Sequence, residues 1–91
     1  MRYIDVRWIH DNREDPIRSL SEIGEDEFEK RKLEFFVDGS VTFASAGDHS
    51  GNTELGTMEI PPLDEINEDK EFEGIEISRS DFEGLWLKYS K

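Results

Sequence analysis

The sequence predicts an α+β domain, with an antiparallel sheet of about four to five strands and two C-terminal helices packed on one face. Three observations predict this class: alternating apolar and polar residues near the start, an Asp-Gly pair between two β-rich runs, and an amphipathic helical pattern near the end. A chain of 91 residues is short enough for one core, so we expect a single domain spanning residues 1–91.

The first predicted strand lies at the start of the chain. Ile4, Val6 and Trp8 alternate with Asp5 and Arg7, which gives one apolar and one polar face. The polar residues 10–16 read as a turn, and residues 17–23 as a second strand.

A hairpin is the strongest local signal. In "FEKRKLEFFVDGSVTFAS", two β-rich runs flank Asp38-Gly39, the dipeptide that best tolerates the positive φ angles of a two-residue type I′ turn. Residues 45–56 are rich in Gly, Ser and Asn and predict a loop.

The periodicity changes after Met58. Pro61 and Pro62 end any strand, "LDEINEDKEF" then predicts a short helix, and "GIEIS" one more short strand. Ser78 is placed to cap a final helix whose apolar residues recur at helical spacing. The residues expected to form the main core are Val6, Trp8, Leu33, Phe35, Val37, Phe43, Phe82, Leu85 and Trp86.

Composition excludes several functions. The net charge of −12, from 23 acids and 11 bases, repels nucleic acid and anionic lipid and favours encounter with basic surfaces. There is no cysteine, so disulfides and thiolate metal sites are excluded. The first apolar stretch is interrupted by Arg2, Asp5 and Arg7, which argues against a signal peptide or membrane span and makes the cytoplasm the expected location.

No pattern in the chain indicates catalysis, so we expect neither an enzyme nor a cofactor. The only histidines, His10 and His49, each adjoin an aspartate, but nothing in their spacing requires a shared metal. No serine lies in a Gly-x-Ser-x-Gly context, and no glycine-rich segment carries a phosphate-binding lysine. The basic run at residues 30–32 predicts a solvated strand face or an edge strand guarded against aggregation; the alternative is an internal ion-pair partner for the acidic segment.

Four segments together resemble a family of small bacterial domains of unknown function. They are "YIDVRWIHD", "SEIGEDEFEKRKLEFFVDGSVTFAS", "ELGTMEIPPLDEI" and "EFEGIEISRSDFEGLW", in the same order and over nearly the whole chain. The resemblance implies an intracellular bacterial or phage setting and a single-domain protein, without a known activity. Ile9 stands where a second His is frequent in that family, which weakens a metal site built on a His pair.

An acidic segment suggests the function. Residues 61–78 carry seven acids and one base, Lys70. We expect a non-enzymatic inhibitor or immunity protein that blocks a basic effector, such as a nuclease toxin or a phage-defence nuclease, because ordered carboxylates can replace phosphates in a positive cleft. The residues expected to bind this partner are Asp64, Glu65, Glu68, Asp69, Glu71 and Glu73.

Two alternatives remain open at this stage. The charge can serve solubility alone. The protein can also be a small-ligand or peptide-binding module that uses the sheet near Arg7, Trp8 and His10. A flat acidic surface favours the inhibitor, whereas a concave pocket favours the ligand module. The sequence does not indicate the oligomeric state.

Overall fold

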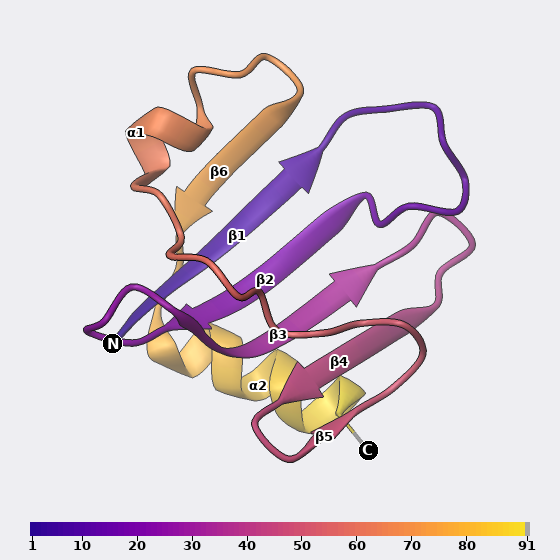
Figure 1. Cartoon of the computed structure of the whole chain (residues 1–91). Helices are drawn as coiled ribbons and strands as arrows, with labels where there is room; N and C mark the ends of the chain where they lie inside the picture. The colour runs from indigo at the N-terminus through magenta and orange to yellow at the C-terminus, as the bar shows by residue number, and fades with distance from the viewer. Residues whose placement is uncertain (91) are drawn as a thin grey trace.

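The computed structural model describes residues 1–90 as one sheet with a helix on each side (Figure 1). The elements in chain order are β1 (Arg2–Trp8), β2 (Arg18–Ile23), β3 (Glu29–Phe35), β4 (Val41–Ser45), β5 (Asp48–His49), α1 (Leu63–Ile66), β6 (Phe72–Glu76) and α2 (Arg79–Tyr89). The α+β class is confirmed. Within the described residues, no helix is both long enough and apolar enough to cross a membrane.

The sheet has six antiparallel strands in the order β5-β4-β3-β2-β1-β6, so the predicted count of four to five was too low. The additional pairing is short: Asp48 and His49, predicted to lie in a loop, form β5 beside β4. β6 returns to pair with β1, which places the C-terminal strand at the opposite edge from β5.

The register decides which face α2 covers. Asp5 lies opposite Leu20, which lies opposite Leu33, which in turn lies opposite Phe43. Because cross-strand partners share a face, this row is apolar on three central strands, and α2 packs on it.

Three predicted core residues lie outside the core beneath α2. Val6 belongs to the next row, opposite Ser19, so Val6 and Trp8 face away from α2. Val37 is 46% exposed because it lies in the turn after β3. The core prediction was therefore wrong for these three residues. The fully or nearly fully buried apolar residues are Tyr3, Ile4, Leu20, Ile23, Leu33, Ala44 and Phe82.

Aromatic contacts hold α2 on the sheet. Phe82 is fully buried and lies 5.3 Å from Tyr3 between ring centroids. One turn later, Trp86 stacks on Phe82 at 6.0 Å and meets Phe43 edge-on at 5.7 Å. The predicted cap is confirmed, since the Ser78 hydroxyl accepts a hydrogen bond from the Asp81 amide at the start of α2.

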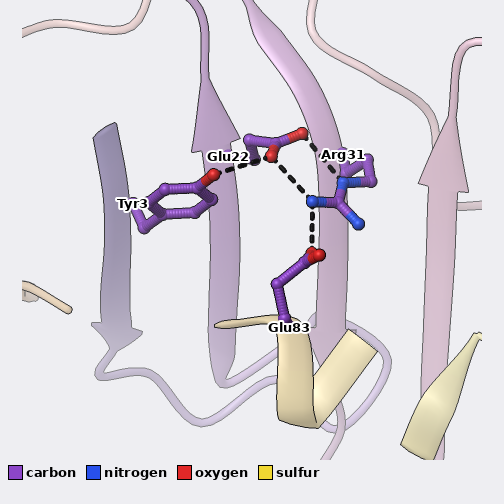
Figure 2. Close-up of polar contacts among 4 residues, drawn as sticks. All are labelled: Tyr3, Glu22, Arg31 and Glu83. Carbon is purple, nitrogen blue, oxygen red and sulfur yellow. Dashed lines mark hydrogen bonds and ion pairs between the residues drawn. The ribbon is translucent and has the colours of Figure 1, made fainter. Parts of the chain in front are cut away.

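A partly buried polar network also joins α2 to the sheet (Figure 2). The Arg31 guanidinium donates two hydrogen bonds to Glu22, at 2.8 and 2.7 Å, and forms an ion pair with Glu83 of α2. The Tyr3 hydroxyl donates to Glu22 at 3.0 Å. The bonds from Arg31 hold the pKa of Glu22 below its usual value, and burial together with the Glu22 carboxylate raises the pKa of Tyr3.

The β3–β4 hairpin forms where it was predicted, but with a different turn. The Phe36 amide donates to the Ser40 carbonyl at 3.0 Å, which closes a three-residue loop instead of a two-residue one. Gly39 has a φ of 90°, as expected, whereas Asp38 does not have a positive φ. Only the last loop position is left-handed, so the type I′ prediction was wrong and the three-residue hairpin applies.

The second face is covered without a long helix. Residues 50–62, here called the strap, cross the sheet on the side opposite α2 and lead into α1 (Figure 1). The predicted helix over residues 63–72 is reduced to the single turn Leu63–Ile66, because Asn67 ends it and the chain reverses into β6. The two helices therefore lie on opposite faces, and the prediction that both pack on one face was wrong.

Phe82→Ala should lower the free energy of unfolding by about 3–5 kcal/mol, because it removes a fully buried ring. Leu87→Ala on the same helix is the control. Leu87 is 66% exposed, so its loss should cost about 0.5 kcal/mol or less. Urea unfolding of the two variants measures both values, and equal losses would show that α2 is rotated.

Glu22 should contribute stability that is lost in acid. Its folded-state pKa lies below the ordinary value of 4.5, so the contribution is fully present above that value and declines as pH falls through the folded pKa. The unfolding free energy of Glu22→Gln should therefore decrease less than that of the wild type between about pH 7 and about pH 3. Denaturant titrations at several pH values test this, and parallel pH curves for the two proteins would contradict it.

Candidate functional site

A cavity of about 370 Å³ lies on the second face, between the sheet, the strap and α1. This volume falls within the range of small-ligand pockets. Its walls are apolar, its floor carries two serine hydroxyls and a buried carboxylate, and its mouth is acidic. The lining residues are Ile4, Val6, Ser19, Ser21, Glu29, Ile60, Pro61, Glu65, Ile66, Asp69 and Phe72.

A glycine allows α1 to sit close to the sheet. Gly74 of β6 lies opposite Val6, and a Cβ at this position would approach Leu63 to 2.8 Å. This close approach lets the single turn of α1 pack over β6, where Ile66 forms part of the cavity wall. A larger residue at position 74 would thus displace the Leu63 side chain on this side of the cavity.

Glu29 fixes the strap to the floor. Its side chain is nearly fully buried, and it accepts hydrogen bonds from the Ser21 hydroxyl at 2.9 Å and the Gly56 amide at 2.7 Å. Lys32 supplies the counter-charge, with Nζ 3.1 Å from Oε1 of Glu29. Because these partners satisfy the carboxylate, Glu29 acts as a structural anchor within the floor.

Further bonds hold the strap at both ends. Near its start, the Thr53 hydroxyl donates to Glu34 at 2.6 Å. Near its end, the Ile60 amide donates to the Glu27 carbonyl at 2.7 Å, and Arg2 donates to the Ile60 carbonyl at 3.2 Å. The strap is therefore tied to the sheet along its length, which keeps the cavity open beneath it.

The six predicted partner-binding acids are all exposed, but they do not share one face. Glu65 and Asp69 line the mouth of the cavity, whereas Glu73 lies on the α2 face, opposite Arg7 in the β1–β6 register. Asp64, Glu68 and Glu71 occupy the outer surface of α1 and the turn that follows. The structure thus brings only two of the six acids to the cavity.

None of these six acids forms an ion pair within residues 1–90. The basic run instead pairs with other acids: Lys30 with Asp26, and the two that follow it with Glu22, Glu83 and Glu29. The prediction that this run pairs with the acidic segment was therefore wrong, and so was the prediction of an edge strand, because β3 lies inside the sheet. The ion pairs of this run are internal and join it to the β2–β3 turn, β2, β3 and α2.

The free edge of β6 is closed to strand addition at its centre. The Asn67 side-chain amide donates to the Gly74 carbonyl at 3.0 Å and accepts from the Gly74 amide at 2.6 Å. It occupies both groups that an incoming strand would pair with. A partner strand consequently cannot pair with the backbone groups of Gly74.

The residues of the alternative site do not converge. Trp8 faces the second side of the sheet and stacks on Phe72 at 5.9 Å, whereas Arg7 points to the opposite face. His10 packs against Trp8 at 4.2 Å, and its ring nitrogens contact the Pro16 carbonyl and the Asn12 amide.

The two histidines are also far apart. His10 follows β1, whereas His49 lies on β5 at the far edge of the sheet. No group of three or more acidic or histidine side chains in the described part of the chain is arranged to hold a metal ion.

Sequence reasoning missed the floor and most of the walls of the cavity. It identified the apolar alternation that contains Val6, but assigned that face to the helix-covered core. The available signal was in β2, where Ser19 and Ser21 alternate with Leu20. These small polar residues of β2 pair with the apolar residues of β1 on the same face of the sheet, which indicates that no helix packs on this face.

Comparison with known proteins places the chain in a family without an assigned activity. The family described as "Domain of unknown function (DUF6881)" matches residues 2–91, so the chain belongs to it, as the resemblance implied. No curated protein and no solved structure matches the chain.

Proposed function

We propose that this member of the DUF6881 family is a non-catalytic binding protein for a basic protein partner, as an inhibitor or immunity protein would be. One observation carries the proposal: the six acids of residues 64–73 are exposed and lack an internal cation within the described residues. Other acids of the chain, such as Glu22 and Glu29, are paired internally. Acids without an internal ion pair also occur elsewhere, such as Glu14, Glu25 and Glu54, but six of them lie within the ten residues 64–73, which is their highest density in the described chain.

The physical argument rests on long-range attraction. A net charge of −12 accelerates encounter with a basic surface, and rim carboxylates act mainly on the association rate. A nuclease cleft is a suitable partner surface because it is positive in order to hold phosphates. The like-charge repulsion of the acidic segment is then relieved in the complex.

The cavity supports a binding role over a role in solubility alone. Solubility requires surface charge but not a concave, mostly apolar site. The cavity also favours the second candidate, a peptide- or small-ligand-binding module. The site of that module is the cavity on the second face, and not the region of Arg7 and His10.

The combined variant Glu65→Gln, Glu68→Gln and Glu71→Gln should lose partner capture while keeping the fold. These carboxylates accept no hydrogen bond from any residue in the described range, so their neutralisation should leave the melting temperature unchanged or raise it. Immobilised protein is exposed to a host lysate, and the retained proteins are identified by mass spectrometry.

The matched control neutralises three exposed acids elsewhere: Glu14, Glu25 and Glu54. It removes the same charge, so it should retain basic proteins that the first variant loses. With a purified partner, the first variant should slow association more than it speeds dissociation. Equal capture by the wild type and the first variant at low and at moderate salt would refute the proposal.

A further inference from the structure

We infer that the cavity on the second face receives one long basic side chain, an arginine or lysine, from the protein partner. This inference rests on the proposed function and adds the mode of recognition. The occupant has an apolar stem that lies between the cavity walls and a cationic end that meets Glu65 and Asp69 at the mouth.

The walls fit an alkyl stem. Ile4 and Val6 of β1, Phe72 of β6 and Ile66 of α1 present apolar side chains from elements that the sheet and Gly74 hold in place. A basic side chain readily buries its methylene groups against such surface while keeping its charge near water. Phe72 adds an aromatic face on which a guanidinium can stack.

The charges at the cavity select a cation. None of the lining residues is basic, and the two acids at the mouth lack an ion-pair partner within the part of the chain described here. The one lining acid in the floor, Glu29, already has Lys32 as its partner. An anionic ligand would be repelled, and a purely apolar ligand would leave the acids of the mouth unused. An amphipathic cation satisfies both the walls and the mouth.

The blocked edge of β6 restricts how the partner approaches. Asn67 occupies the backbone groups of Gly74, so the partner does not add a strand there. Insertion of a side chain beside α1 needs no free backbone group of β6. The geometry thus favours a side-chain anchor in a pocket, which is how many interface hot spots act.

The test titrates the full chain with the tripeptide acetyl-Gly-Arg-Gly-amide and follows the backbone amide signals of the protein by NMR. The norleucine tripeptide, which keeps an alkyl stem but lacks the charge, is the matched ligand. The arginine peptide should shift amide signals of the cavity residues Val6, Ser19, Ile66 and Phe72, and should bind at least about fivefold more tightly than the norleucine peptide, because charged hydrogen bonds are the stronger ones. Equal binding of the two peptides, or shifts confined to other surfaces, would overturn the inference.

Two double variants distinguish binding in the cavity from general attraction to the acidic segment. Glu65→Gln with Asp69→Asn should weaken arginine-peptide binding at least about fivefold, whereas Glu68→Gln with Glu71→Gln should change it less than about twofold. Both pairs remove two charges from the same segment, but only the first pair lines the cavity. Equal weakening by the two pairs would show diffuse attraction and contradict a side-chain pocket.

A third variant blocks the cavity without changing charge. Ser19→Leu should fill the floor and abolish peptide binding while the melting temperature is retained. If partner capture depends on the acids but is unaffected by Ser19→Leu, the side-chain anchor is wrong and the proposed function stands. If capture is unaffected by removing the acids, the proposed function fails, and the peptide titration still decides whether the cavity binds a basic side chain.

Discussion

A two-faced sheet with one long helix is the constraint from which the rest of the structure follows. Six strands expose two faces, but within residues 1–90 α2, of 11 residues, is the one helix of more than a single turn, and it covers one face. The strap and the single turn of α1 must cover the other. A strap lacks the continuous apolar stripe of a helix, so it is fixed by polar anchors and leaves space beneath it. The cavity is this space.

Charge is distributed according to the same constraint. On the α2 side, Arg31 is shared between Glu22 of the sheet and Glu83 of the helix, and its guanidinium lies 5.0 Å from the Phe82 ring centroid. On the strap side, Lys32 neutralises Glu29. Adjacent residues of β3 thereby stabilise opposite layers, because side chains alternate across a strand. The acids of residues 64–73 lie outside both networks, so their carboxylates face solvent without an internal counter-charge.

Local signals in the sequence predicted most of the elements. Alternation located β1, the polar turn after it marked the start of β2, the Asp-Gly pair located the β3–β4 hairpin, and Ser78 with the helical spacing after it located α2. The assignment of faces was less successful. An alternating strand such as β1 has an apolar side, but only the register with β2 shows that Leu20 lies on the other side, beneath α2. Register depends on contacts distant in sequence, so local periodicity does not reveal it.

The candidate site was predictable only in part. The acidic segment was visible as composition, and Glu65 and Asp69 were among the residues proposed from it. The cavity depends on two close approaches, of Gly56 to Glu29, which are 27 residues apart in the chain, and of Gly74 to Leu63, which join α1 to the strand that follows it. Nothing in the sequence around either glycine indicates its tertiary partner.

Glu29 holds the strap on the sheet and so maintains the cavity. Hydrogen exchange at the Gly56 amide tests it directly, because this amide donates to Glu29 on an otherwise exposed residue. In the wild type the Gly56 amide should exchange far more slowly than its exposure implies, and in Glu29→Ala it should exchange at the rate of a free loop while the α2 amides stay protected. Rapid exchange of the Gly56 amide in the wild type would show that Glu29 does not hold the strap.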